Sequence, residues 1–225
     1  MEDVMGDAAR KSALYDAFAR TGKALSSGKR LELLDLLAQG ERPVEALARA
    51  AGLNLTTASA HLQTLKQAGL VTTRREGVRV HYRLAGEDVA ALYAMLRRVA
   101  RAHQPAVEPA RAAYLGADPG EGVGREELLA RAAAGDVVVL DVRPAEEYAA
   151  GHIPGAVSIP VGELPERIAE LPPDTDVVAY CRGTYCVLAH DAVRLLRERG
   201  RTAARLTDGM LEWRLDGLPV ETTAA

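Results

Sequence analysis

The chain has 225 residues, of which 48% are hydrophobic and 26% are charged, and its formal net charge is −3 at pH 7. This length allows one or two ordinary domains, and this composition excludes fibrous and wholly disordered proteins. The amino-terminal residues are acidic and no apolar run approaches the ~20 residues of a membrane helix, so we expect a cytoplasmic protein without a membrane partner.

The small net charge conceals a difference between the two halves of the chain. Residues 1–105 carry 16 Lys and Arg against 11 Asp and Glu, a net +5, whereas residues 106–225 carry 12 against 20, a net −8. An excess of positive charge favours binding to a polyanion. The first half is therefore the candidate for DNA binding.

Helical patterns recur between residues 13 and 68. Residues 13–38 have apolar side chains at helical spacing, interrupted at residues 26–28, which predicts two helices. Pro43 suits the first turn of a helix that ends before Gly52, and Asn54 is a suitable N-cap for a helix over residues 55–68. Two short helices joined by a glycine-containing turn are typical of a helix-turn-helix.

A β-hairpin and another helix follow. Residues 71–75 and 78–84 flank a Glu-Gly turn, and residues 88–103 have apolar positions at core or dimer spacing. The second helix of the motif and the basic hairpin supply polar groups that suit contacts with bases and phosphates. The alternative for His61 is that it caps its own helix. The alternative for the hairpin is that its arginines are only solvated. The candidate DNA contacts are Thr57, Ser59, His61, Gln63, Lys66, Arg74, Arg75 and Arg79.

Residues 58–71 (ASAHLQTLKQAGLV) resemble the recognition helix and wing entry of the ArsR family of bacterial repressors, and the resemblance extends over about residues 24–103. It implies a homodimeric repressor that binds double-stranded operator DNA and whose first and last helices form the dimer interface. The chain departs from the family pattern at Ala60, where a longer polar or basic residue is common, and it lacks the Cys-x-Cys pair of the metal-sensing members. We therefore expect no metal and no cofactor.

The remaining chain begins with a segment rich in Pro and Gly, which is typical of a domain boundary. From residue 125, predicted helices and buried strands alternate, which indicates a parallel sheet with helices on both faces. The predicted fold class is thus a mainly-α winged helix-turn-helix followed by an α/β domain. The expected ranges are 10–104 for the first domain, 105–122 for the linker and 123–222 for the second domain.

Both cysteines lie within residues 177–186 (VVAYCRGTYC), which predict a strand, a tight turn and the start of a helix. The N–H groups of such a turn and the positive helix end favour a thiolate at Cys181. Arg182 adds a positive charge that can bind an anionic sulfur donor. One close pair of thiols in a chain without an export signal favours a reactive role over a structural disulfide.

This loop, together with residues 139–143 (VLDVR), 151–156 (GHIPGA) and 208–220 (DGMLEWRLDGLPV), resembles a single rhodanese domain. The resemblance implies that Cys181 carries sulfur as a persulfide. The chain departs from the usual loop at Cys186, which either attacks that persulfide or is only a small residue at the helix start. Asp141 and Arg143 are supporting residues, as an ion pair between loops or as substrate contacts.

Taken together, these features predict a DNA-binding repressor that senses sulfane sulfur or redox state through Cys181, with polysulfide, a persulfide or thiosulfate as the donor. One alternative is a thiosulfate or polysulfide sulfurtransferase whose helix-turn-helix only positions or dimerises it. The other is a DNA-binding protein whose rhodanese fold is inert.

Overall fold

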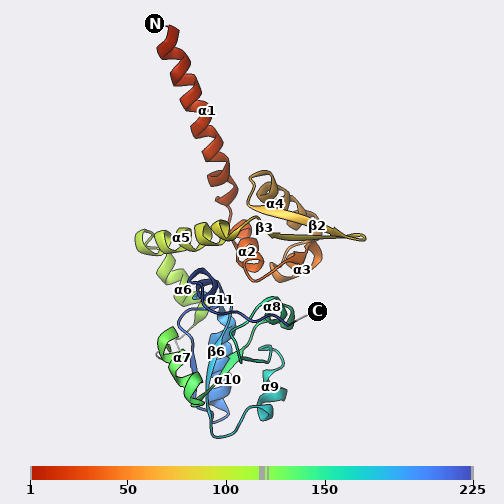
Figure 1. Cartoon of the computed structure of the whole chain (residues 1–225), viewed down its shortest axis with the longest axis vertical. Helices are drawn as coiled ribbons and strands as arrows, with labels where there is room; N and C mark the ends of the chain where they lie inside the picture. Colours follow the sequence, from red (N-terminus) through yellow and green to blue (C-terminus); the bar gives the residue numbers. More distant parts are fainter. Residues whose placement is uncertain (1, 117–119, 121, 224–225) are drawn as a thin grey trace. The chain divides into compact units, whose positions relative to one another are not determined.

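The computed structural model describes residues 2–116, 120 and 122–223 (Figure 1). The chain forms two compact units, Met1–Tyr93 and Ala94–Ala225. Residues 117–119 and 121, in the predicted linker, lie outside the described residues. In the part of the chain that the structure describes, none of the helices combines the length and the apolar character needed to cross a membrane.

The first unit is mainly helical, as predicted. Leucines at helical spacing form its core, where Leu33, Leu47, Leu62 and Leu65 are fully buried. The side chain of Asn54 accepts a hydrogen bond from the N–H group of Thr57 at 2.8 Å, which confirms its predicted capping role. The helices are α1 (Glu2–Leu25), α2 (Gly28–Leu37), α3 (Val44–Ala50), α4 (Leu55–Gln67) and the first half of α5 (Glu87–His103).

The predicted hairpin is present as β2 (Val71–Glu76) and β3 (Arg79–Leu84), which pair antiparallel. Its turn contains Gly77 at φ 59°, a left-handed conformation that glycine adopts without strain. A two-residue strand, β1 (Arg42–Pro43), also pairs with β3. The sequence did not predict β1, because two residues carry no periodic pattern, and Pro43 precedes helix α3 instead of opening it.

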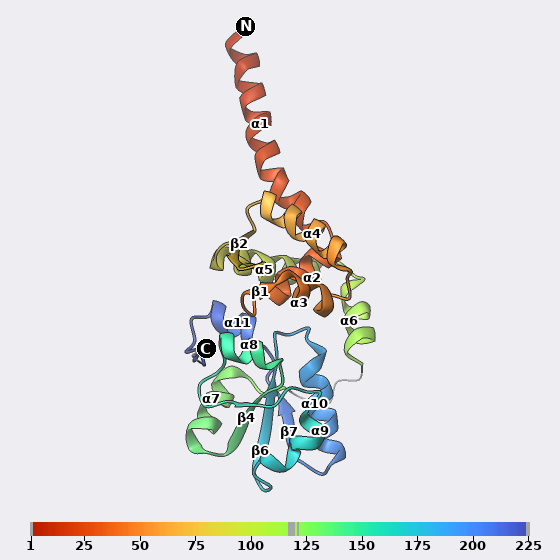
Figure 2. The same cartoon turned by 90° about the vertical axis from the view of Figure 1, so that its right-hand side faces the viewer.

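The second unit contains a four-stranded parallel sheet in the order β5-β4-β6-β7, which confirms the predicted α/β fold class. Figure 2 shows α7 on one side of this sheet and α9 and α10 on the other. The strands are β4 (Val137–Asp141), β5 (Val157–Ser158), β6 (Asp176–Tyr180) and β7 (Ala203–Arg205). The helices are α6 (Val107–Leu115), α7 (Arg125–Ala134), α8 (Ala145–Ala150), α9 (Leu164–Arg167), α10 (Val187–Glu198) and α11 (Met210–Leu215).

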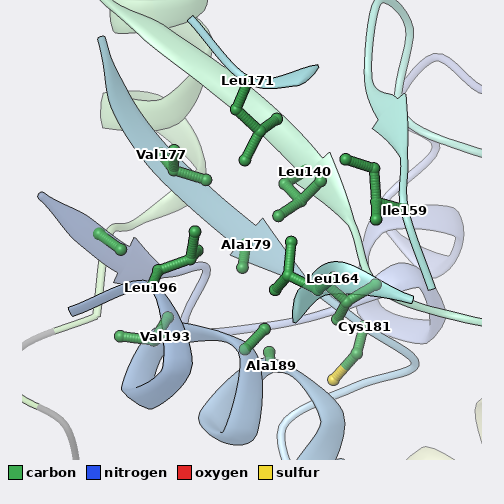
Figure 3. Packing of buried hydrophobic residues seen from close by; sticks show 13 residues of the cluster. Leu140, Ile159, Leu164, Leu171, Val177, Ala179, Cys181, Ala189, Val193 and Leu196 are labelled. Carbon is green, nitrogen blue, oxygen red and sulfur yellow. The ribbon is translucent and has the colours of Figure 1, made fainter. Parts of the chain in front are cut away.

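Strand β6 places the first cysteine. Val177, Ala179 and Cys181 belong to the apolar cluster that α10 covers, shown in Figure 3, whereas Val178 and Tyr180 belong to the cluster on the other face. This alternation follows from the two-residue period of a strand. Cys181 therefore lies directly beyond the carboxyl end of a buried parallel strand, where open α/β sheets commonly bind ligands.

Candidate functional site

The cysteine loop, residues 181–186, connects β6 to α10, and Cys186 is the residue immediately before the helix. The first two residues of α11 donate backbone hydrogen bonds of 3.0 and 2.9 Å to the carbonyl oxygens of Cys181 and Arg182. Gly209, which precedes α11, lies so close that a Cβ there would overlap the backbone of Gly183. The path of the cysteine loop is thus fixed by the start of α11.

The two thiols lie at the two ends of the loop and influence each other's ionisation. Cys181 is buried, with 3% of its surface exposed, and its sulfur lies 3.4 Å from the carbonyl oxygen of Cys186. Cys186 is half-buried. The loop therefore brings together the two cysteines that the sequence identified as candidates.

The pKa values of the two thiols move in opposite directions. Burial raises the pKa of the Cys181 thiol well above its ordinary value, and the hydrogen bond to Cys186 raises it further. The hydrogen bond from Cys181 lowers the pKa of Cys186, and the charge of Arg182 lowers it further. In the reduced pair, Cys186 therefore loses its proton more readily than Cys181. The expectation of a thiolate at Cys181 was wrong because burial outweighs the backbone N–H groups there.

Arg182 binds a buried carboxylate from α8. Its Nη2 donates to Glu147 Oε1 at 2.6 Å, and its Nε lies 2.9 and 3.0 Å from the two carboxylate oxygens. The Glu147 side chain is fully buried, whereas the Arg182 side chain is 20% exposed. Most of the positive charge expected beside the thiols is thus balanced by a residue that the sequence analysis missed. An acidic residue in the first turn of a short helix resembles an ordinary solvated residue in sequence.

Asp141 and Arg143 form a fully buried ion pair, with Nη2 and Oδ2 2.6 Å apart. Arg143 also donates to the carbonyl oxygen of Gly151 at 2.8 Å, and the Tyr180 hydroxyl donates to Asp141 at 2.6 Å. Burial raises the pKa of Tyr180, so this hydroxyl stays protonated. These contacts join the ends of β4 and β6 to a neighbouring turn. They correspond to the first of the two roles considered for Asp141 and Arg143, an ion pair between loops.

An open cleft of about 350 Å³ lies next to the cysteine loop. Arg182 and Leu188, which lie near the two cysteines in sequence, form part of its wall. Most other wall residues come from the segments after β4 and β5, and they include the carboxylates of Glu146 and Glu163. The cleft has room for a small sulfur donor.

In the first unit, α4 and the hairpin carry the candidate DNA contacts. Gln63 donates to the Tyr82 hydroxyl at 3.0 Å and Lys66 donates to the Thr73 hydroxyl at 2.8 Å, so side chains of α4 are tied to the hairpin. Thr57, Ser59 and His61 are half-buried on the same helix.

The arginines of the hairpin differ in their surroundings. Arg74 binds the carboxylates of Glu41 and Glu76 at 2.6 and 3.0 Å. Arg75 and Arg79 are exposed close to the hairpin turn. Arg74 is therefore bound by carboxylates, whereas Arg75 and Arg79 face solvent.

Comparison with known proteins identifies both parts of the chain. Residues 124–216 match the rhodanese-like domain and residues 25–74 match a helix-turn-helix domain. The chain is 60% identical over 219 residues to the HTH-type transcriptional regulator Rv0324 of Mycobacterium tuberculosis, which covers 97% of this chain and 96% of that protein. It is also 36% identical over 86 residues to a sulfurtransferase of Allochromatium vinosum, which covers 38% of this chain and 78% of that protein.

A solved structure is similar to the first part. It is the homodimeric winged helix-turn-helix domain of Mb0332 from Mycobacterium bovis, described as a possible ArsR-family transcriptional regulator, with 63% identity and a TM-score of 0.41 over 43% of this chain and 90% of that one. The match to Rv0324 extends over nearly the whole length of both proteins. The chain therefore belongs to the HTH-type transcriptional regulators in which an ArsR-type winged helix-turn-helix is joined to a carboxy-terminal rhodanese-like domain.

Proposed function

We propose that this regulator is a cytoplasmic, homodimeric repressor that releases operator DNA when its cysteine loop takes up sulfane sulfur. The observation that carries the proposal is the placement of Cys181 and Cys186 at the two ends of one short loop, with the Cys181 sulfur 3.4 Å from the Cys186 carbonyl oxygen, beside a cleft of about 350 Å³. Cys181 and Cys186 are the two cysteines of the sequence, so the first unit contains no thiol. Thiol chemistry is therefore confined to this loop.

In the first step, Cys186 acts as the base for Cys181. The proton of Cys181 moves along the hydrogen bond to the Cys186 thiolate, and the Cys181 thiolate attacks the terminal sulfur of a polysulfide. The new bond joins this sulfur to Cys181, and the sulfur–sulfur bond of the donor breaks. The shortened polysulfide leaves with the electron pair of that bond, so that Cys181 becomes a persulfide.

In the second step, the persulfide is converted to a disulfide. Cys186 gives up its proton to solvent and attacks the sulfur atom that is bonded to the Cβ of Cys181. The bond between the two cysteines forms while the outer sulfur leaves with the electron pair and takes up a proton from solvent to become hydrosulfide. The polysulfide is the oxidant for the two steps together, and the two thiols are oxidised.

The charges around the loop favour an organic persulfide or a singly protonated polysulfide over thiosulfate. The guanidinium of Arg182 is bound by the Glu147 carboxylate, and Glu146 and Glu163 add negative charge to the cleft. A dianion such as thiosulfate meets more repulsion at this cleft than a monoanionic or neutral donor.

The first unit supplies DNA binding in this proposal. Helix α4 enters the major groove, where Thr57 and Ser59 lie towards base edges, and the exposed Arg75 and Arg79 bind phosphates. Dimerisation buries large apolar side chains that are 39–64% exposed in the single chain. They are Leu14, Tyr15 and Phe18 on α1 and Leu92, Met95 and Val99 on α5.

The uptake of sulfur is tested by the intact mass of the protein after brief exposure to polysulfide. We expect Cys186→Ser, which lacks the base, to take up one sulfur more slowly and to keep it. The unmodified sequence should end with the loss of two hydrogens, and Cys181→Ser should show neither change. Sulfur uptake by Cys181→Ser would overturn the assignment of Cys181 as the acceptor. An unchanged mass for all three proteins would overturn the proposed sensing function.

A sulfurtransferase activity is the second candidate, because residues of the second unit are similar to the sulfurtransferase of Allochromatium vinosum. Its test is the repeated formation of thiocyanate from thiosulfate and cyanide. Many turnovers for each protein chain would favour the enzyme, whereas a single stoichiometric modification favours the regulator.

A further inference from the structure

Arg97 lies in the second half of α5. It contacts Tyr185 of the cysteine loop directly, and it is linked to Thr184 of the same loop through the carboxylate of Glu212. Its guanidinium carbon lies 4.5 Å from the centre of the Tyr185 ring, and its Nη2 lies 3.4 Å from Oε1 of Glu212. The same carboxylate oxygen accepts a hydrogen bond from the Thr184 hydroxyl at 3.3 Å. We call Arg97, Thr184, Tyr185 and Glu212 the Arg97 cluster; all four lie in the second unit.

The Arg97 cluster is largely shielded from water. The side chains of Arg97 and Glu212 are only 13% and 22% exposed. A cation over an aromatic ring and an ion pair are stronger in such surroundings than at an open surface. Glu212 also accepts a hydrogen bond of 3.1 Å from the N–H group of Gly209, which holds the carboxylate at the start of α11. The cluster therefore stabilises one shape of the cysteine loop.

Helix α5 continues from the Arg97 cluster into the first unit. It is one uninterrupted helix from Glu87 to His103, and Val89 and Tyr93 near its start are buried. The Tyr93 hydroxyl donates to the Asp35 carboxylate of α2 at 3.2 Å. A rigid, packed helix is one of the elements through which coupling between two sites is carried.

Arg97 and the exposed apolar residues of α5 lie on different faces of the helix. With 3.6 residues per turn, Leu92, Met95 and Val99 fall on one stripe, and Arg97 lies on nearly the opposite side. Contact of the stripe with a second copy of the chain is thus compatible with contact between Arg97 and the cysteine loop.

We propose that Arg97 couples the chemical state of the two thiols to the DNA-binding unit through α5. This inference rests on the proposed uptake of sulfane sulfur by the loop. When the loop changes shape, the ring of Tyr185 and the hydroxyl of Thr184 leave Arg97 and Glu212, and α5 loses the contacts that hold its second half.

Closure of the disulfide supplies the change of shape. Thr184 and Tyr185 are two of the four residues between the cysteines, so a covalent bond between Cys181 and Cys186 fixes the ends of the segment that carries them. Tyr185 also borders an open cleft of about 330 Å³, whose wall includes Arg97, Val107 and Tyr114. The Tyr185 ring therefore has space into which it can move.

The test compares Arg97→Ala with Arg101→Ala, a matched control one helical turn later whose side chain is 53% exposed. Arg97→Lys, which retains the charge without the planar group, is a second variant if Arg97→Ala does not fold. Each protein is assayed for sulfur uptake by mass and for binding to a DNA duplex selected from a random-sequence library by the reduced protein. Fluorescence of Trp213, the only tryptophan in the sequence and a buried neighbour of Glu212, reports the movement of α11.

We expect polysulfide to weaken DNA binding by the unmodified sequence and by Arg101→Ala about 5- to 150-fold, the range of typical allosteric coupling. Arg97→Ala should take up sulfur at the same rate, but its affinity should change less than about threefold. A full response by both Arg97 variants, or a loss of their sulfur uptake, would overturn the coupling role. If the unmodified sequence itself takes up no sulfur, the proposed function fails instead, and the two failures are distinguishable.

Discussion

Arg182 and Glu147 form a bidentate pair in which the carboxylate is fully buried and the guanidinium reaches the surface of the cleft beside the cysteine loop. The pair places a charged side chain next to the thiols and also balances its charge. An arginine with this partner lowers the pKa of Cys186 without forming an open binding site for a dianion.

Glu147→Gln should therefore change both stability and donor preference. Removal of one partner of a buried ion pair costs about 3 kcal/mol of the free energy of unfolding. The unbalanced charge of Arg182 should raise the rate of reaction with thiosulfate about tenfold, which corresponds to about 1.4 kcal/mol, with a smaller effect on a neutral organic trisulfide. Thermal unfolding and sulfur uptake measure the two effects. Glu127→Gln, which removes an exposed carboxylate of α7 outside the cleft wall, is the control. Equal donor preference in both variants would contradict this role of Glu147.

The hydrogen bond from Cys181 predicts an unusual pH dependence for Cys186. Because this bond lowers the pKa of Cys186, its thiolate should be present below the ordinary thiol value of about 8.5, and alkylation by iodoacetamide should begin at lower pH. Cys181→Ala removes the donor and should move the alkylation midpoint of Cys186 to higher pH. Cys181→Ser retains a donor and should move it less. Peptide mass after alkylation across pH 5–10 gives the midpoints, and the same midpoint in all three proteins would refute the interaction.

Gly209 should be sensitive to the smallest substitution. A Cβ at Gly209 would overlap backbone atoms of Gly183 and Cys181, which cannot move without displacing the cysteine loop. Gly209→Ala should lower the free energy of unfolding by about 1–3 kcal/mol and slow sulfur uptake. Gly124→Ala is a suitable control, since a Cβ at that position meets nothing within 4 Å and Gly124 lies outside the cleft wall. Similar chemical denaturation curves for the two variants would show that the close approach at Gly209 is unimportant.

The arginines of the hairpin should differ in their effects on DNA binding. Arg79 is exposed, so Arg79→Ala should lower the slope of log affinity against log salt concentration by about 1. Arg74 must first leave the carboxylates of Glu41 and Glu76, so Arg74→Ala should have a smaller effect. Binding titrations at several salt concentrations measure the slope. A larger effect of Arg74 than of Arg79 would place the DNA on another part of the hairpin.

The fold was predictable because its elements carry periodic patterns. Leucines at helical spacing, the cap at Asn54 and the apolar strand before Cys181 identified most helices and the parallel sheet. The two-residue β1 and the four-residue α9 were missed because elements this short show no period. Their positions depend on contacts with distant strands and loops.

The thiols were predictable as a pair, whereas their ionisation and their surroundings were not. The depth at which Cys181 is buried is a property of the packed sheet and of α10, and it raises the pKa of the thiol at which a thiolate was expected. Glu147 and Arg97 are far from the cysteine loop in sequence, and neither lies in a motif. Only the folded chain shows that both of them touch residues of the loop.

The central claim is that sulfur on Cys181 controls DNA binding, and the most direct test is a DNA-binding titration before and after exposure to polysulfide. The unmodified sequence and Cys181→Ser should bind a selected duplex equally well in the reduced state. Polysulfide should release the DNA from the unmodified sequence and leave the complex of Cys181→Ser intact. Release of the DNA from Cys181→Ser at the same polysulfide concentration would contradict the account.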